Sequence, residues 1–215
     1  MNDWIIISIV ALYVLLVCTV SVILYKKNKI TKRTARMLVH LFSGLSIISL
    51  FFAGNKWIYF MASALITLIV FLSRKSTPLL KHLFHSIGEE QELIYLQGPF
   101  LYCISITYLI VFSIITDNNI IPLVSTLILV LSDPLAAFIG RRYGKSKFLI
   151  LDNNRTIEGS LAMLVSNIII ISLFYGLGMK AIAISFIISI VEIISPSKVD
   201  DFTLPLSASI LLISY

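Results

Sequence analysis

The fold is decided by residues 120–147, which read IIPLVSTLILVLSDPLAAFIGRRYGKSK. A long apolar run reaches Asp133, and a segment rich in glycine and basic residues follows it. A charged side chain in lipid is costly, so a carboxylate at this position is a candidate functional group. The stretch therefore predicts a helix that enters a membrane and carries a chemically active site at one end.

The composition of the chain agrees with a membrane protein. Its 215 residues are 58% hydrophobic and 13% charged, with a mean hydropathy of +0.98, and a water-soluble domain does not have such long apolar blocks. A helix needs about 20 apolar residues to cross a bilayer. Blocks of this kind predict spans near 4–24, 38–54, 57–72, 99–116, 120–139, 160–178, 181–195 and 203–215.

The predicted fold class is therefore all-α: a polytopic transmembrane helical bundle of seven or eight helices, because the last two blocks are short and could be tilted, re-entrant or partly interfacial. We expect one integral-membrane domain over residues 1–215. Within it, residues 1–30 form a peripheral first helix and basic loop, and residues 33–210 form the core.

Basic residues predict the orientation. If the N-terminus lies outside, 15 of the 17 Lys and Arg residues fall in inner loops, and only Lys56 and Lys180 lie outside. The positive-inside rule therefore favours a cytoplasmic membrane protein with its N-terminus outside and its site facing the cytosol. The net charge of +6 comes mostly from this asymmetry and does not indicate nucleic acid. Cys18 and Cys103 fall in apolar spans, which argues against a disulfide or a thiolate metal site.

The pair Asp133-Pro134 predicts a break in the fifth span. Proline inside a helix removes a hydrogen bond, whereas proline after an Asp N-cap is favourable. On a helix that restarts at Pro134, the small residues Ala137, Gly140 and Gly144 lie within about 40° of one another. They would form a strip on which a phosphate or headgroup approaches the backbone. The alternative is an N-cap with small-residue helix packing.

A basic cluster follows, comprising Arg141, Arg142, Lys145, Lys147 and Arg155. Such a cluster suits a triphosphate, although a basic loop could also serve only to fix topology. Asp133 and Glu158 flank it and could hold Mg²⁺ together with phosphate oxygens. The segment is not a P-loop, because Gly140 is one residue too close to the Gly-Lys-Ser sequence and a membrane helix precedes it.

Polar groups elsewhere are less specific. Glu192 lies in an apolar block and is expected to face the bundle interior, where it pairs with a cation or metal. Asp200 and Asp201 are either functional or solvated loop acids. His40 is either an interfacial hydrogen-bonding residue or a ligand, and residues 81–92, with His82 and His85, are predicted to be an amphipathic segment on the inner surface.

These motifs occur in a recognisable order along the chain. Arg36, His40 and Gly44 open the second span, and Gly88, Tyr95 and Gly98 precede the fourth. The most specific series is Asp133, Ala136, Gly140, Arg141, Gly144 and Lys147, followed by Thr156, Glu158, Gly159 and Ser160; Glu192 and residues 200–206 close the pattern. Over residues 33–210 the chain resembles the CTP-dependent lipid-alcohol kinases, which include dolichol, phytol and farnesol kinases and the yeast-type diacylglycerol kinase. It departs from their pattern at Met37, Ser132, Arg155 and Asp201.

The resemblance implies transfer of a phosphoryl group from CTP, with Mg²⁺, to the hydroxyl of a polyprenol, a phytol-like alcohol or diacylglycerol that enters from the inner leaflet. The residues it implies for catalysis are Asp133, Glu158, Glu192, Arg36 and His40. Those implied for the nucleotide are Gly140, Arg141, Arg142, Gly144, Lys147, Arg155, Thr156, Gly159 and Ser160, and those for the metal are Asp133, Glu158 and Asp200.

Two other functions are compatible with the sequence. A phosphatidate cytidylyltransferase needs the same cations and metal, but it releases pyrophosphate, whereas a kinase releases CDP. A transporter or scramblase would use buried acids as an ion path. That function predicts acids spread through the membrane depth, and most acids here gather on the predicted inner side.

Overall fold

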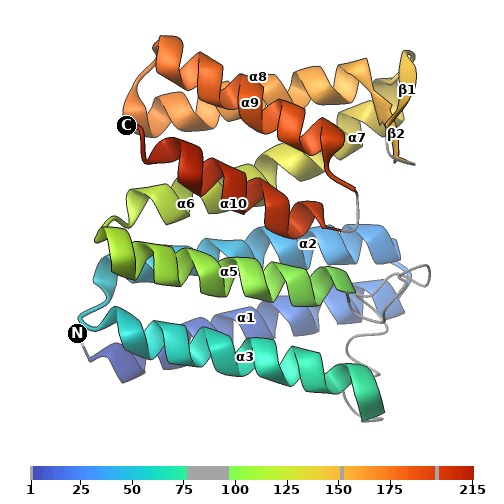
Figure 1. Cartoon of the computed structure of the whole chain (residues 1–215). Coiled ribbons are helices and arrows are strands. Elements are labelled where there is room, and N and C mark those ends of the chain that lie inside the picture. Colours follow the sequence, from blue (N-terminus) through green and yellow to red (C-terminus); the bar gives the residue numbers. More distant parts are fainter. Residues whose placement is uncertain (1, 77–96, 151–152, 197–198) are drawn as a thin grey trace. The chain divides into compact units, whose positions relative to one another are not determined.

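The computed structural model describes residues 2–76, 97–150, 153–196 and 199–215. The chain is predominantly helical (Figure 1), as the apolar blocks predict. Its contacts fall into two compact units, Met1–Asp117 and Asn118–Tyr215, and each is described by itself. The expected single domain over residues 1–215 stays a prediction.

The first unit consists of helices that pack in pairs. These are α1 (Asp3–Lys26), α2 (Lys32–Gly44) with the short 3-10 helix η1 (Leu45–Phe52), α3 (Lys56–Ser76) and α5 (Gln97–Thr116). Helix α1 packs on α2, and α3 packs on α5. Leu50 and Leu109 are among the most completely buried side chains of this unit. The helices form because their apolar side chains recur on the faces that meet, while the remaining apolar faces stay exposed.

Polar contacts fasten one end of this unit. The carboxylate of Asp3, in the first turn of α1, accepts hydrogen bonds from the backbone N–H groups of Gly54 (2.8 Å) and Asn55 (2.9 Å). Lys56 Nζ lies 3.0 Å from the Asp117 carboxylate and also donates to the Ser113 carbonyl oxygen. These contacts fix the turn between η1 and α3 and the end of α5.

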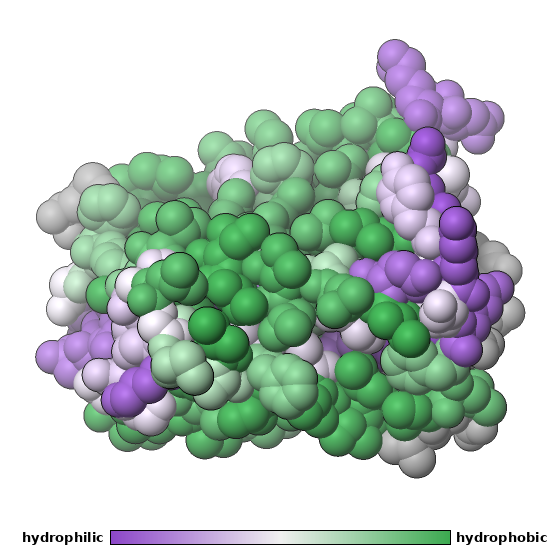
Figure 2. Space-filling model, turned by 90° about the horizontal axis from the view of Figure 1, so that it is seen from above, coloured by the Kyte–Doolittle hydropathy of each residue, from purple (hydrophilic) through white to green (hydrophobic). Residues whose placement is uncertain are grey.

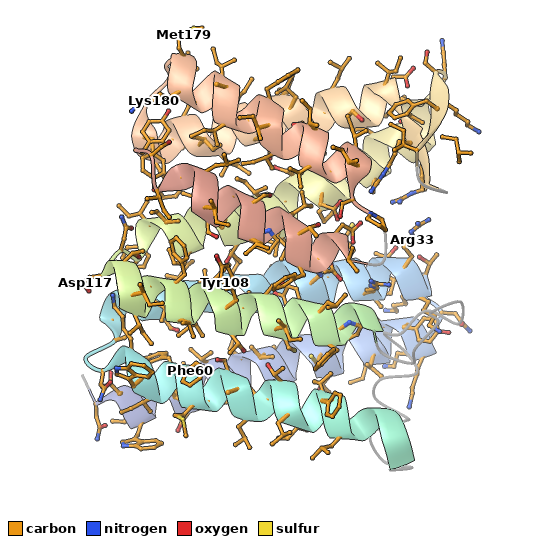
Figure 3. All side chains as sticks on the ribbon, in the orientation of Figure 1. Arg33, Phe60, Tyr108, Asp117, Met179 and Lys180 are labelled. Atoms are coloured by element: carbon orange, nitrogen blue, oxygen red, sulfur yellow. The ribbon has the colours of Figure 1, made fainter. Side chains whose placement is uncertain are left out.

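The second unit holds most of the candidate site. It runs through α6 (Ile120–Leu127), the π-helical turn η2 (Ile128–Ser132), α7 (Asp133–Tyr143), strands β1 (Lys147–Ile150) and β2 (Asn153–Thr156), α8 (Ile157–Tyr175), α9 (Met179–Ile194) and α10 (Asp200–Leu212). Helix α8 packs on α7 and on α9, and α10 packs on α9 and on α6. Met179 and Lys180 mark the beginning of α9 (Figure 3).

The expected break at Asp133 is wrong. Asp133 has helical backbone angles, and its N–H donates to the carbonyl oxygen of Ile128, five residues earlier, so the chain stays helical from Ile120 to Tyr143. Pro134 cannot donate a hydrogen bond and its ring crowds the preceding turn. The wider π turn before it accommodates both effects, and such turns are frequent at functional sites.

The β1–β2 hairpin was not predicted from the sequence. Its strands pair antiparallel, with Lys147 opposite Thr156, Phe148 opposite Arg155, and Ile150 opposite Asn153. The hairpin stands at the end of the second unit where α7 ends and α8 begins (Figure 1).

The surface suits a bilayer. In the part of the chain that the structure describes, five helical segments are long and apolar enough to cross a membrane: Asp3–Lys26, Lys32–Phe52, Gly98–Thr116, Ile120–Tyr143 and Ile157–Tyr175. A shorter apolar helix covers Lys56–Leu72. Figure 2 shows hydrophobic residues over most of the visible face and hydrophilic residues gathered toward its ends.

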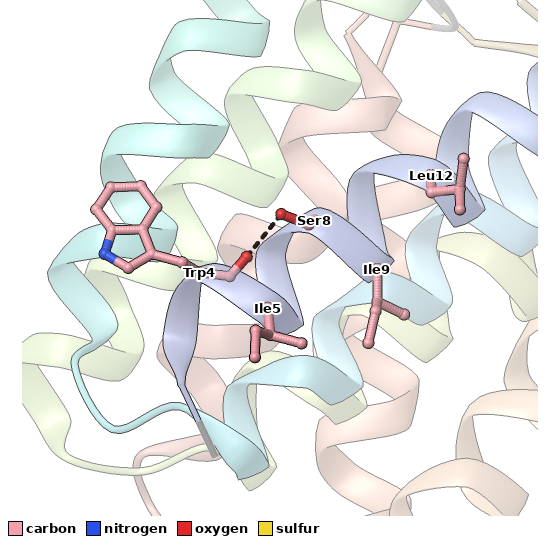
Figure 4. A pocket seen from close by; sticks show the side chains of 5 residues that line it. All are labelled: Trp4, Ile5, Ser8, Ile9 and Leu12. Atoms are coloured by element: carbon pink, nitrogen blue, oxygen red, sulfur yellow. Dashed lines mark hydrogen bonds between the residues drawn. The ribbon is translucent and has the colours of Figure 1, made fainter.

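Helix α1 illustrates the lipid-facing surface. Trp4, Ile5, Ser8, Ile9 and Leu12 line a hollow on its outer side (Figure 4). Ser8 is the polar residue of this group, and its hydroxyl is satisfied within the helix, because Ser8 Oγ donates to the Trp4 carbonyl oxygen (2.7 Å). Apolar side chains exposed in this way are stable next to acyl chains.

Candidate active site

The centre of the candidate site is an arginine held among carboxylates. Arg155, at the end of β2, lies 2.5 Å from Glu192 Oε1 through Nη1 and 3.8 Å from Asp200 Oδ2 through Nη2. Nη2 also donates to the Glu192 carbonyl oxygen (3.2 Å). The exposed fractions of the side chains are 16% for Arg155 and 4% for Glu192. The prediction that Glu192 faces the interior and pairs with a cation is confirmed, and the cation is Arg155.

Asp133 belongs to the same cluster. It begins α7, directly after the π turn, and its carboxylate acts electrostatically on those of Glu192 and Asp200. Asp201, which is buried, acts on Asp200 in the same way. Two carboxylates therefore contact the Arg155 guanidinium, and two more act on those carboxylates; the packing of the second unit brings them together from α7, α9 and α10. We call Asp133, Arg155, Glu192, Asp200 and Asp201 the carboxylate cluster.

Glu158 has a separate position. It lies in the first turn of α8, and its Oε1 accepts hydrogen bonds from the backbone N–H groups of Lys145 (2.9 Å) and Ser146 (3.2 Å). Its Oε2 is buried and has no hydrogen-bond partner among the described residues. The carboxylate thus holds the turn between α7 and β1, and one oxygen remains able to accept from a cation.

The glycine strip lies against α8. A Cβ atom on Gly140 would stand 2.7 Å from Thr156 Oγ1, and one on Gly159 would stand 2.9 Å from the Ala136 carbonyl oxygen. Thr156 is the N-cap of α8 and accepts from the Gly159 N–H. A Cβ on Gly144 would also meet Thr156. These residues therefore allow α7 and α8 to approach closely, which is the packing alternative; their predicted contact with a nucleotide stays a prediction.

The remaining predicted nucleotide residues lie around the hairpin. Arg141, Arg142 and Lys147 are exposed, and Ser160 is half-buried in the first turns of α8. Arg142 Nε donates to the Tyr143 hydroxyl (3.3 Å). Arg155 contacts two carboxylates, those of Glu192 and Asp200.

Arg36 and His40 belong to the first unit, on α2. The His40 ring packs against the Tyr102 ring, with centroids 4.3 Å apart. The Tyr102 hydroxyl donates to the His40 carbonyl oxygen (3.1 Å) and lies 3.0 Å from Ser43 Oγ. His40 therefore takes part in the packing of α2 on α5. Gly88, Tyr95 and the amphipathic segment 81–92 lie outside the described residues.

The carboxylate oxygens of the site suit a Mg²⁺ ion that is bound jointly by the protein and by substrate phosphates. Asp133 and Asp201 act electrostatically on Asp200, and Glu158, at its separate position, has a buried oxygen, Oε2, without a hydrogen-bond partner among the described residues. Among the described residues no three His, Cys, Asp or Glu side chains form a complete ligand group. Mg²⁺ is commonly bound by one or two carboxylates plus substrate phosphates, so a complete protein ligand set is not required.

Two fully buried polar side chains of the second unit have no role predicted from the sequence. Ser132, directly before Asp133, is fully buried, and its hydroxyl has no hydrogen-bond partner in the described part of the chain. Asn167, in the middle of α8, is also fully buried, and its Nδ2 lies 3.4 Å from Ser189 Oγ on α9. A polar residue inside an apolar helix block was the available indication, because such residues seldom face lipid.

Comparison with known proteins gives one informative similarity. The chain is 22% identical to a phytol kinase from Synechocystis sp. over 217 aligned positions, which cover 97% of this chain and 90% of that protein. No protein-family model matches the chain, and no solved structure matches it. The similarity extends over nearly the whole of both chains, and it supports a relationship with lipid-alcohol kinases.

Proposed function

We propose that this protein transfers the γ-phosphoryl group of CTP to the hydroxyl of a membrane lipid alcohol, such as a polyprenol, a phytol-like alcohol or diacylglycerol. The observation that carries the proposal is the carboxylate cluster at the end of a membrane-embedded helical unit, next to an exposed basic hairpin. The similarity to a phytol kinase supports a lipid alcohol as the acceptor.

Phosphoryl transfer requires mainly positioning and neutralisation of charge. Asp133 and Asp200 would hold Mg²⁺, with Glu158 Oε2 as a further acceptor, and the ion would neutralise the phosphates. The exposed Arg141, Arg142 and Lys147 would bind phosphate oxygens, for which Arg and Lys are suited.

Arg155 has a different role in this proposal. It lies between Glu192 and Asp200 and would hold their carboxylates at fixed positions rather than bind a phosphate. Either Asp133 or Glu192 would accept the proton of the lipid hydroxyl. Arg36 and His40 remain predicted contacts of the substrate. We propose a cytoplasmic membrane location with the cytosol-facing site that the basic loops predict.

The experiment uses the purified full chain in detergent with Mg²⁺, labelled CTP and a panel of phytol, polyprenol and diacylglycerol. CDP together with a phosphorylated alcohol is the expected result and names the acceptor. Pyrophosphate together with a CDP-lipid, formed from added phosphatidate, would replace the proposal by a cytidylyltransferase. Absence of both products from folded protein, with ATP and GTP also tested as donors, would overturn it.

A further inference from the structure

The β1–β2 hairpin connects two candidate membrane spans directly. The span Ile120–Tyr143 ends shortly before Lys147, and the span Ile157–Tyr175 begins at the residue after Thr156. The backbone N–H of Ile157 donates to the Ser146 carbonyl oxygen and closes the base of the hairpin. A hairpin this short cannot leave the vicinity of the helix ends, so it lies at the level of the bilayer surface.

The two faces of the hairpin differ. Phe148 is half-buried and stands opposite Arg155, whose guanidinium reaches the carboxylate cluster, so this face points into the unit. Lys147 and Leu149 alternate with it and are exposed. The exposed fraction of Leu149 is 66%.

The exposed surface is both apolar and basic. Tyr143, at the end of α7, is 59% exposed, and residues 141–156 contain five basic residues and one acidic residue, Asp152. Phosphate binding by these bases does not account for the exposed Leu149 beside them. A leucine and a tyrosine among bases are the composition of segments that lie in the headgroup region of anionic membranes.

The exposed side chains of helix α8 indicate which side of the unit faces lipid next to this hairpin. Large apolar side chains are more than half exposed at every fourth position from the hairpin onward: Ile157, Leu161, Val165 and Ile169. Every fourth residue shares a helix face. The lipid-facing stripe of α8 therefore begins at the base of β2.

We propose that the outer face of the β1–β2 hairpin docks on the surface of an anionic bilayer. Leu149 and Tyr143 enter the headgroup region, and Lys145 contacts lipid phosphates. Because the inner face carries Arg155, docking also holds the hairpin against the carboxylate cluster. The proposal does not depend on the chemistry of the site.

The test measures the membrane depth of the hairpin. A spin label is attached to Leu149→Cys in a Cys18→Ala/Cys103→Ala background, and the full chain is reconstituted in phosphatidylcholine with or without phosphatidylglycerol. Phe148→Cys, on the inner face, is the matched control. We expect oxygen to relax the label at 149 more strongly than a water-soluble nickel chelate does, and this difference should be larger when phosphatidylglycerol is present. Relaxation of the control label at 148 should be the same with and without phosphatidylglycerol.

Charge reversal separates the electrostatic part. One basic residue near an anionic surface changes the ratio of docked to undocked hairpin about fivefold. Lys145→Glu should therefore reduce the effect of phosphatidylglycerol on the label by at least that factor. A label at 149 that the nickel chelate relaxes in both membranes, or that responds equally to both lipids, would overturn the proposal.

A fluorescent probe tests the same proposal if the Cys18→Ala/Cys103→Ala protein does not fold. Leu149→Trp in Trp4→Phe/Trp57→Phe protein should be quenched more by brominated phosphatidylglycerol than by brominated phosphatidylcholine. The replaced tryptophans are largely exposed, so their loss removes little packing. Equal or absent quenching would overturn the proposal in the same way.

Discussion

Gly159→Ala should separate α7 from α8. The added methyl group would stand 2.9 Å from the Ala136 carbonyl oxygen and 3.2 Å from Gly140 Cα. Both are backbone atoms, so the clash is relieved only if the two helices move apart. Overpacking of a tight contact costs about 1–3 kcal/mol, and we expect the upper part of that range.

Gly140→Ala should be milder, because its new methyl group meets the Thr156 side chain first, at 2.7 Å. That side chain can rotate, but rotation breaks the N-cap hydrogen bond to the Gly159 N–H, at a cost of about 1 kcal/mol. Gly178→Ala is the matched control, because nothing lies within 4 Å of its added methyl group. It should cost less than about 1 kcal/mol.

The assay is equilibrium unfolding in mixed micelles, in which SDS is titrated and helix content is followed by circular dichroism. From most to least stable, the expected order of the variants is Gly178→Ala, Gly140→Ala and Gly159→Ala. If Gly159→Ala is as stable as the control and instead binds CTP more weakly, the strip contacts phosphate and the packing argument is refuted.

Three further predictions concern individual side chains. Arg155→Gln leaves Glu192 buried without its cation and should cost about 3–5 kcal/mol in the same assay; adding Glu192→Gln should restore part of the loss, and no recovery would count against the pair. Glu158→Gln removes the charge that the two loop amides donate to, so hydrogen–deuterium exchange of those amides should accelerate; unchanged exchange would show that the carboxylate does not hold the loop. Met37→Lys introduces the basic residue that the lipid-alcohol kinase pattern often has at this position, and it should be tolerated or mildly activating, whereas strong inhibition would show a pocket built around an apolar side chain.

The helices could be predicted because a bilayer imposes one simple requirement, a long apolar block. Each predicted block is helical over most of its length in the structure, including the short ones that correspond to α9 and α10. Pro134 misled the prediction because a proline can either end a helix or be absorbed by a π turn, and the sequence does not distinguish the two. The hairpin was missed because its strands are short and the two residues that join them, Leu151-Asp152 in the sequence, are not an Asn-Gly or Asp-Gly pair.

The site was predicted in its composition more than in its contacts. Residue type and predicted depth identified Asp133 and Glu192, since an acid in lipid requires a partner. The sequence predicted a cation or metal as the partner without naming it, because Arg155 stands among the neighbouring bases and pairs with a carboxylate 37 positions away. The glycine strip was ambiguous for a physical reason, because close packing of a helix and close approach of a phosphate both require the absence of a Cβ atom.

The central claim is that Asp133 acts in phosphoryl transfer to a lipid alcohol, and Asp133→Asn tests it most directly. The variant keeps the size of the side chain and removes its charge. We predict that the purified variant retains its helix content and its unfolding midpoint but forms neither CDP nor phosphorylated alcohol under conditions in which the unmodified chain forms both. Near-normal turnover by the folded variant would contradict the account.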